Sequence, residues 1–382
     1  MNFNLSCNWQ IDKMRAPDLH IITFGVPYPA QYGGAIDSWN RILALHQLGL
    51  NLHIHCFLYG DFRPDPALRE VAGEVHYYPR VVWPALFSKG QPYIVTSRKS
   101  QALLKRLNAD RSPILFEGIH TTGFIAQLRD RILLLRAHNV EQHYYAELAL
   151  QSSGLKSMLF QRESLCLSEY ESNTAKAVKV VFAISPSDQD WFAHQGATSV
   201  FIPPFHGSQE VAIQTGRGGY LLYQGDLSLE INQNALLDLL FRLPMDAAYP
   251  VIAAGRSGDK TFEDKLATFP NLSREANVSQ EKMIDLIQRA QVILIHSLHG
   301  SGMKLKIFPA LYHGKFIAAT ANCMTHTDLD QAIHFYDNAS LSDTLTLLWS
   351  SEFTDARLNQ RKEILAHHPS DLDKAKEIIR YL

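Results

Sequence analysis

The 382-residue chain lacks several features that mark specialised classes of protein. It has no run of about 18 apolar residues, and its first residues lack the basic and apolar regions of a signal peptide. Its formal net charge is only −2, which argues against nucleic acid as the main partner. We therefore expect a cytoplasmic protein without a membrane-spanning helix, with contact at the inner face of a membrane as an open alternative.

Cysteine is also scarce. The four cysteines lie far apart and form neither a Cys-x-x-Cys motif nor a His–Cys pattern: Cys7, Cys56, Cys166 and Cys323. Such spacing indicates neither a disulfide framework nor a zinc site. We expect reduced thiols, no bound metal and no cofactor.

The composition that is present is ordinary for a globular protein, 46% hydrophobic and 19% charged, over a length that fits two domains. Short apolar runs alternate with helical patterns in both halves of the chain, which predicts an α/β fold with doubly wound parallel sheets. Proline is absent from residues 141–177, where Gly154 is the only glycine. This segment is therefore predicted to be largely helical.

The positions of the apolar runs suggest where the domains divide. Strands are predicted at residues 19–24, 52–58, 75–78, 114–116, 132–135, 178–184 and 200–202, and then at 220–224, 251–254, 292–295 and 316–320. Between these two series, proline and glycine gather in residues 203–208 and 216–219, as in an interdomain linker. We predict an N-terminal domain at 1–204, a linker at 205–218, a C-terminal domain at 219–368 and an amphipathic segment at 369–382.

A glycine turn follows the apolar run 292–295 and leads into a helical pattern. It consists of Gly300, Ser301, Gly302, Met303, Lys304, Leu305 and Lys306. Glycines let a backbone approach a ligand, and the first N–H groups of a helix attract anions. Lysines in the first turn of a helix are disfavoured by roughly 0.3–1 kcal/mol, so their presence indicates a compensating anion such as phosphate. The alternative is an ordinary turn with solvated lysines.

A second glycine pair and a set of titratable residues occupy the ends of strands in the first half. Gly33 and Gly34 precede a helical pattern, where they would expose N–H groups, although a plain turn is the alternative. The titratable residues are Glu117, His120, Arg136, His138 and Glu141. Because strand ends line the cleft of an open α/β sheet, we expect them to form one site. Each also has a structural interpretation, such as a carboxylate at a helix start or a buried histidine.

Several motifs occur in the order found in one family. They are Pro27-x-Pro29 before Gly33-Gly34, Arg136-x-His138-Asn139-x-Glu141, Gly225-Asp226-Leu227 with Asn232, Ala254-Gly255-Arg256, and Gly302-Met303-Lys304-Leu305-Lys306 with Gly314. Together they resemble the GT-B glycosyltransferases, and more narrowly the retaining, family 4-like (group 1) branch that includes sucrose-synthase-like and mannosyltransferase-type enzymes. The resemblance spans nearly the whole chain. It implies two Rossmann-like doubly wound domains facing a central cleft, with the C-terminal helix returning to the N-terminal domain.

The resemblance also implies a function. The protein would be a metal-independent hexosyltransferase that moves a sugar from a nucleotide diphosphate sugar to a glycan or lipid-linked acceptor in cell-surface polysaccharide synthesis. Its catalytic residues would be His138, Lys304 and Glu141, and its acceptor-binding residues Glu117, His120 and Arg136. Its donor-binding residues would be Gly33, Gly34, Gly225, Asp226, Gly255, Arg256, Asn277, Ser301, Gly302, Met303, Lys304 and Lys306.

The sequence departs from the family at a pair of glutamates, whose positions fall near Ser301 and on Pro309. Either donor recognition is rearranged around Lys304, Lys306 and Ser301, or catalysis has been lost. Pro309 is expected to kink the predicted helix or to mark a later start. The alternatives are thus a catalytically silent nucleotide-sugar-binding subunit, or a GT-B epimerase or hydrolase.

One further stretch bears on membrane contact. Its aromatic and basic residues are Tyr77, Tyr78, Arg80, Trp83, Phe87 and Lys89. They fit either a peripheral membrane contact or a packed surface loop.

Overall fold

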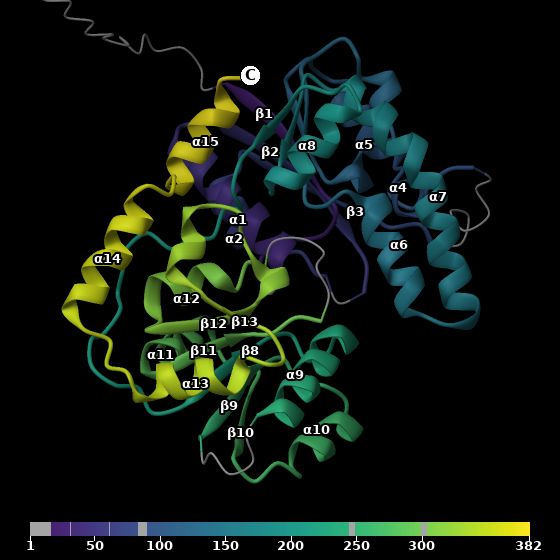
Figure 1. Cartoon of the computed structure of the whole chain (residues 1–382). Helices are drawn as coiled ribbons and strands as arrows, with labels where there is room; N and C mark the ends of the chain where they lie inside the picture. The colour runs from purple at the N-terminus through teal and green to yellow at the C-terminus, as the bar shows by residue number, and fades with distance from the viewer. Residues whose placement is uncertain (1–16, 31, 61, 83–89, 244–248, 299–303) are drawn as a thin grey trace, which may run out of the picture.

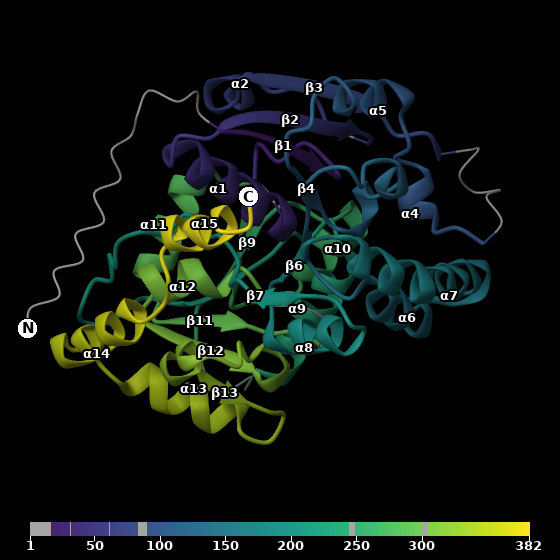
Figure 2. The same ribbon diagram turned by 90° about the horizontal axis from the view of Figure 1, so that it is seen from above.

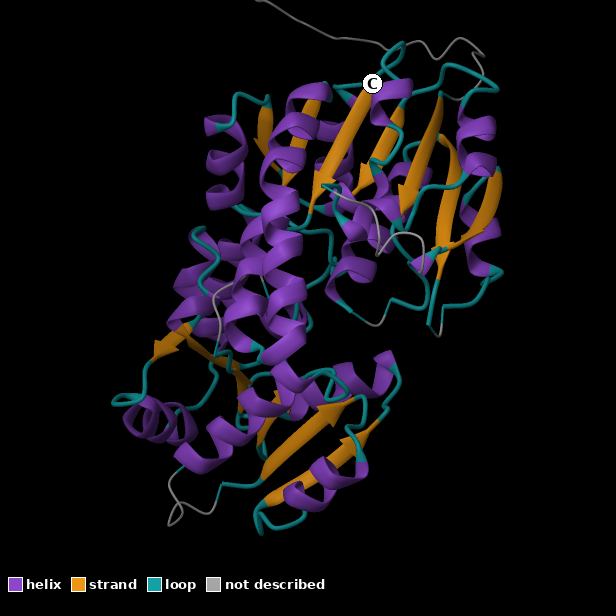
Figure 3. Cartoon of the chain, turned by 90° about the vertical axis from the view of Figure 1, so that its right-hand side faces the viewer, coloured by secondary structure: helices purple, strands orange, loops and turns teal. Residues whose placement is uncertain are grey.

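Two parallel sheets, each covered by helices on both faces, form the two halves of the molecule (Figure 1, Figure 3). The computed structural model describes residues 17–30, 32–60, 62–82, 90–243, 249–298 and 304–382. The predicted α/β fold with two Rossmann-like doubly wound domains is confirmed. Among the described helices, none is both long and apolar enough to cross a membrane.

The N-terminal sheet has seven parallel strands in the order β3-β2-β1-β4-β5-β6-β7. The order reverses at β1, which pairs with β2 on one side and β4 on the other, and open α/β sheets bind ligands beside such a reversal. The strands are β1 (Asp18–Thr23), β2 (Asn51–Leu58), β3 (Glu74–Pro79), β4 (Ile114–Glu117), β5 (Leu133–Ala137), β6 (Val180–Ala183) and β7 (Ser199–Phe201).

Helices cover both faces of this sheet. One core packs α1, α2 and α15 on the strands, and the other packs α4, α5, α7 and α8. The elements are α1 (Gly33–Gln47), α2 (Ala67–Val71), α4 (Tyr93–Thr96), α5 (Gln101–Leu107), α6 (Glu141–Gln151), α7 (Gly154–Ala177), α8 (Pro186–His194), α15 (Asp371–Ile379) and the 3₁₀ turns η1 (Ile119–Thr121) and η2 (Ile125–Gln127).

The long helical segment predicted for residues 141–177 is divided into two helices, α6 and α7, that pack side by side (Figure 1). The break falls at Ser152 and Ser153, and Gly154 begins α7 with a φ of 59°. Glycine adopts this left-handed conformation without steric cost, so the single glycine of the segment marks the break.

The C-terminal sheet has six parallel strands in the order β10-β9-β8-β11-β12-β13. They are β8 (Leu221–Gln224), β9 (Val251–Gly255), β10 (Leu272–Ala276), β11 (Val292–Ile295), β12 (Phe316–Thr320) and β13 (His334–Tyr336). The sequence interpretation missed β10 and β13. Both are edge strands, and the polar run of β10 and the three residues of β13 lack the apolar pattern of a central strand.

The helices of this domain also form two layers, with α9, α10 and α13 on one face and α11, α12 and α14 on the other. They are α9 (Glu230–Arg242), α10 (Lys260–Leu266), α11 (Gln280–Arg289), α12 (Ile307–His313), α13 (Leu341–Ser350) and α14 (Asp355–Ala366), with 3₁₀ turns η3 (Ala321–Cys323) and η4 (Asp328–Ala332).

The start of α12 corrects one expectation. The helix begins at Ile307, so Lys304 and Lys306 precede its first turn instead of lying in it. Pro309 lies in that first turn, where backbone N–H groups have no acceptor within the helix. The N–H group that proline lacks is therefore not needed there. Of the two expectations for Pro309, the later start holds, because proline is tolerated there and not in the helix interior.

The chain passes between the domains twice at one place. After β7, His206 stacks on Phe308 of α12 with ring centroids 4.3 Å apart. After α14 the chain returns, and α15 lies beside α1 (Figure 2). Lys374 Nζ of α15 donates to the Pro204 carbonyl at 2.8 Å, and Asp371 accepts from the Gly207 N–H at 2.8 Å. The first crossing is therefore held against α12 by His206, and the second is held to the first by Lys374 and Asp371.

Candidate functional site

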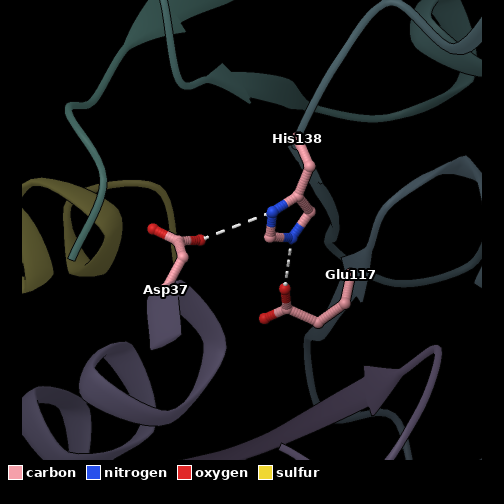
Figure 4. Close-up of side chains that lie close together, drawn as sticks. All are labelled: Asp37, Glu117 and His138. Carbon is pink, nitrogen blue, oxygen red and sulfur yellow. Dashed lines mark hydrogen bonds and ion pairs between the residues drawn. The ribbon is translucent and has the colours of Figure 1, made fainter. Parts of the chain in front are cut away.

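His138 and Glu117 meet at the carboxyl edge of the N-terminal sheet (Figure 4). Glu117 ends β4 and His138 directly follows its neighbour β5, so the parallel pairing brings the side chains together. His138 Nε2 lies 3.1 Å from Glu117 Oε2, and His138 Nδ1 lies 3.9 Å from Asp37 Oδ2. The His138 side chain is 11% exposed whereas both carboxylates are buried. The imidazole is therefore the part of this cluster that a ligand can reach.

Behind His138 lies a buried network of paired charges. Arg41 donates to both Asp37 and Glu117, and Arg136 donates to the two Asp37 oxygens at 2.8 and 3.1 Å. Burial alone would raise the pKa of Asp37, but the two guanidiniums outweigh burial and hold this pKa well below its usual range. Burial also acts to raise the pKa of Glu117, but the charge of Arg41 acts in the opposite direction, and the pKa of Glu117 is lowered. The network thus keeps both carboxylates ionised and fixes the ring of His138.

The network also shows what Arg136 does. Its side chain is fully buried, and Nη1 donates to the Ile202 carbonyl at 2.7 Å, at the start of the interdomain connection. Arg136 was expected to bind the acceptor, but its guanidinium has no surface on which an acceptor can dock. It ties the edge of the sheet to the connection between the domains.

Within the described residues, one group has donor atoms close enough together to hold a metal ion: Asp37, Glu117 and His138, within 4.8 Å of one another. Two guanidiniums already donate to its carboxylates. A divalent cation would have to displace Arg41 or Arg136 from buried ion pairs, which is strongly unfavourable. The donor set therefore fits a structural charge network better than a metal centre.

His120 lies next to His138, separated by an aromatic ring. Phe24, which follows β1, has its centroid 5.2 Å from that of His120 and 5.6 Å from that of His138. Burial, followed by the nearby charge of Arg98, holds the pKa of His120 well below its usual range. His120 is thus neutral, and its Nδ1 atom is buried without a hydrogen-bond partner among the described residues.

Glu141 begins α6 and is 4% exposed. Burial and the neighbouring carboxyl of Glu171 raise its pKa to about 8, so it is largely protonated at neutral pH. Glu171 accepts from the N–H groups of Glu141 and Gln142 at 3.0 and 3.1 Å and so caps α6 from another helix. Glu141 is thus a buried residue at the start of α6, three positions after His138.

The N-terminus of α1 meets the C-terminal domain. Gly33 is its first residue, and a Cβ atom placed on Gly33 would lie 3.0 Å from Leu305 Cδ1. The N-cap residue Tyr32 makes no side-chain capping bond, and the first turn contains no acidic residue. The positive end of this 15-residue helix thus has no side-chain cap and no acidic residue in its first turn, and it lies against the Lys304–Lys306 segment. Gly34 instead packs closely on Phe24.

Lys304 and Lys306 flank Leu305 at this meeting point. Lys306 Nζ lies 4.9 Å from the centroid of the Tyr223 ring and 3.4 Å from the Gln224 carbonyl. Burial lowers the pKa of Lys306 to about 8 and also lowers the pKa of Lys304. The expected donor residues Ser301, Gly302 and Met303 lie outside the described residues.

The remaining expected donor residues lie in the loops after β8, β9 and β10, which are bonded to one another. Gly255 has a φ of 134°, and a Cβ atom there would lie 1.9 Å from the Gly225 carbonyl oxygen, so only glycine fits. Asn277, with a φ of 51°, accepts from the Ser257 N–H. Asp226 lies 3.7 Å from Arg256, which reduces the charge that Arg256 offers a ligand. These loops form one wall at the carboxyl edge of the C-terminal sheet.

The sequence interpretation missed Asp37 and Arg41, which hold the network together. The signal was present: two opposite charges four residues apart occupy the same side of α1 as the apolar residues Ile42 and Leu45. A charged pair on the buried face of a helix indicates partners in the protein interior.

No protein-family model and no curated protein sequence matches the chain. Solved structures do match over nearly its whole length. Anabaena Alr3699/HepE in complex with UDP and glucose is 12% identical, with a TM-score of 0.64 and coverage of 95% of this chain and 98% of its own. TarM is 9% identical, with a TM-score of 0.63 and coverage of 96% and 98%. The pneumococcal O-GlcNAc transferase GtfA, in complex with UDP and GlcNAc, is 11% identical, with a TM-score of 0.57 and coverage of 96% and 98%.

These neighbours share the arrangement of two parallel sheets and differ from the chain in most of their residues. Sequence identity this low supports a shared fold, whereas the activity must be inferred from the residues of the site. The chain has the GT-B fold, in which two Rossmann-like domains are joined as they are in glycosyltransferases of that architecture.

Proposed function

We propose that this protein is a glycosyltransferase that binds a nucleotide diphosphate sugar between its two domains. The observation that carries the proposal is the contact between the start of α1 and the Lys304–Lys306 segment. An uncapped helix N-terminus and two lysines each attract an anion, and here they come from different domains. The adjacent negative groups of a diphosphate match this convergence.

The structural neighbours support the choice of donor. HepE was solved with UDP and glucose, and GtfA with UDP and GlcNAc. In this chain, the joined loops at Gly225, Gly255 and Asn277 would hold the base and ribose, with the sugar directed toward His138. This assignment places the donor mainly on the C-terminal domain and the acceptor mainly on the N-terminal domain.

The proposed chemistry is transfer with retention of configuration. The bond between the anomeric carbon and the diphosphate oxygen breaks, an acceptor hydroxyl oxygen bonds to that carbon on the same face, and the hydroxyl proton passes to the departing diphosphate. The helix N–H groups, Lys304 and Lys306 stabilise the charge that develops on the diphosphate. These groups would serve in place of a metal ion. His138 lines the sugar, while Glu141 positions the 138–141 turn from within the wall.

The acceptor is proposed to be a glycan or a lipid-linked sugar, bound near Glu117 and His120 and used in cell-surface polysaccharide synthesis. Glu117 would act through His138, since it is itself buried. A membrane contact is supported by Val81 and Val82, which are 42% and 40% exposed after β3. Tyr78 is buried in the core and does not contribute, and Trp83, Phe87 and Lys89 lie outside the described residues.

A catalytically silent nucleotide-sugar-binding subunit is the second candidate. It is favoured by Pro309, which stands in the first turn of α12 where the resembling enzymes carry a carboxylate. An epimerase or hydrolase of the same fold would differ by consuming the donor without an acceptor.

Calorimetric titration with UDP and GDP sugars, coupled to an assay for released nucleotide, separates these functions. Release that depends on an added glycan or lipid-linked acceptor supports the transferase. Binding without release indicates the silent subunit, and release without acceptor indicates the epimerase or hydrolase. Absence of binding contradicts the proposal.

The Lys304→Ala variant tests the anion site directly. We expect transfer to fall on the order of 10²–10³-fold, because one donor to the developing charge is lost. Lys362→Ala, at an exposed position of α14, is the matched control and should leave turnover unchanged. Unchanged turnover in Lys304→Ala, with an unchanged melting temperature, would remove that lysine from the mechanism.

A further inference from the structure

A second group of cations lies at the carboxyl edge of the N-terminal sheet and has no role in the donor chemistry. Arg80 directly follows β3, and Arg98 lies two residues beyond α4. Their guanidinium carbons lie 5.0 and 5.1 Å from the centroid of one ring, that of Tyr59, which directly follows β2. Two positive charges therefore share a single aromatic side chain.

Neither charge has a counterion in the described part of the chain. Arg98 is 4% exposed and donates only to uncharged groups, including the Phe24 and Ile94 carbonyls at 3.0 and 2.8 Å. Arg80 Nε donates to the Ser97 hydroxyl at 2.9 Å, and its two Nη atoms make no hydrogen bond with the described residues. A buried cation without a carboxylate is costly, and here a second cation adds repulsion.

The carboxyl group whose field reaches Arg98 does not neutralise it. That group is Glu141, and burial raises its pKa to about 8, so it is largely uncharged at neutral pH. Burial, followed by the charge of Arg80, lowers the pKa of Arg98 to about 10, which leaves Arg98 charged. The charge of Arg80 also acts on Glu163, but burial raises the pKa of that carboxyl, which accepts from the Tyr93 and Ile94 N–H groups and forms no ion pair with either arginine among the described residues. The positive charge of the pair is thus only partly offset.

His120 adds an unused polar atom at the same place. Its Nδ1 atom is buried without a hydrogen-bond partner in the described part of the chain, and both Arg80 and Arg98 act on the ring electrostatically. His120 is separated from His138 only by the ring of Phe24. The cation pair therefore lies close to the position proposed for the reacting sugar.

We propose that Arg80, Arg98 and Tyr59 form a binding site for an anionic group of the acceptor, a phosphate or a carboxylate. The Nη atoms of Arg80 make the contact, since a guanidinium presents paired donors that match both groups. Arg98, which is buried, positions the Tyr59 ring and adds positive potential to the site. The description of the ligand as an acceptor rests on the proposed function, whereas the anion site itself rests on the geometry.

Calorimetry on the full chain with simple probes tests the site. The probes are octyl phosphate, octanoate, inorganic phosphate and uncharged octyl glucoside, each below its micelle concentration and in saturating UDP. We expect at least one anion to bind more tightly than octyl glucoside. Arg80→Gln should weaken that anion about ten- to a hundredfold, the range for losing a hydrogen bond to a charged group. Arg80→Lys should retain most of the affinity, and Arg69→Gln, at an exposed position of α2, should retain all of it.

The pattern among the probes identifies the source of the anion. Preference for octyl phosphate over inorganic phosphate indicates a lipid phosphate, equal affinity indicates a soluble phosphate ester, and preference for octanoate indicates a carboxylate. Equal binding of octyl glucoside and all anions, or unchanged affinity in a folded Arg80→Gln variant, overturns the proposal. UDP binding is measured separately in the same variants, so that a failure of the donor assignment is distinguished from a failure of the anion site.

Discussion

The two sides of the interdomain face handle charge in opposite ways. On the N-terminal side, Asp37, Arg41, Glu117 and Arg136 are buried and form ion pairs with one another. On the C-terminal side, Lys306 has only a carbonyl and an aromatic ring as described partners, and burial lowers its pKa to about 8. Paired buried charges fix a geometry, whereas a buried charge that lacks a counterion is available to a ligand. The paired network of the N-terminal domain therefore positions groups, whereas Lys306, like the Arg80–Arg98 pair, is placed to bind a ligand.

Removing a member of the paired network should give the largest effect on stability. In Arg136→Ala, Asp37 loses two hydrogen bonds from a buried guanidinium, and the Ile202 carbonyl loses its donor. Breaking a buried ion pair costs about 3–5 kcal/mol, and we expect a loss of that size in the free energy of unfolding, measured with urea. Arg69→Gln serves as the control on the same domain. A loss below about 1 kcal/mol, typical of an exposed ion pair, would show that the network does not hold the N-terminal side of the site in place.

Removing Lys306, which has no counterion among the described residues, should have the opposite effects on stability and turnover. In Lys306→Met the apolar stem is retained and the buried ammonium is lost, so stability should be unchanged or slightly higher. Turnover should fall on the order of 10²–10³-fold, since a donor to the developing negative charge is absent. Melting temperature and the rate of nucleotide release, compared with Lys362→Met, measure the two effects. A large loss of stability with normal turnover would show that Lys306 stabilises the fold and does not act on the substrate.

Glu141 is an exception on the N-terminal side, and its effect is expected in the pH dependence of stability. Its pKa is about 8 in the folded protein and close to 4.3 in an unfolded chain, so between these values the folded state binds more protons. Stability should therefore fall as pH rises from about 5 to about 8, by at most about 1.4 kcal/mol per pH unit for this group. Glu141→Gln should reduce that slope, and the raised pKa of Glu171, about 7, accounts for the part that remains.

The control for this prediction is Glu169→Gln, on the exposed side of α7, which should leave the slope unchanged. The measurement is urea unfolding of both variants at several pH values between 5 and 8. An unaltered slope in Glu141→Gln would mean that Glu141 is ionised in the folded protein and belongs with the paired charges.

The sequence was sufficient for the architecture because the central strands of both sheets consist mainly of apolar residues. Their alternation with helices predicts the doubly wound fold, and the glycine pair at Gly33 identifies the start of α1. Edge strand β10 was missed because its residues are polar, and the division between α6 and α7 was missed because helical periodicity continues on both sides of Gly154.

The candidate site was harder to predict than the fold, because strand ends show where side chains gather but not which ones are exposed. His138 and Arg136 lie two residues apart, yet one reaches the surface and the other is fully buried. The difference depends on Asp37 and the Ile202 carbonyl, which lie far away in the sequence. Pairing of that kind is a tertiary property, so the roles of individual charges follow only from the structure.

The packing of α15 on α1 has a consequence for the order in which the protein folds. Ala375 and Ile378 complete the core beneath β1 and β2, and Lys374 bonds to Pro204, 170 positions earlier. Contacts of such long range form late and slow folding, because a long stretch of chain must be closed before they form. During synthesis, the apolar face that α15 covers would therefore stay exposed on the first domain until the second domain had been made. Residues 1–204 expressed alone should associate through that face.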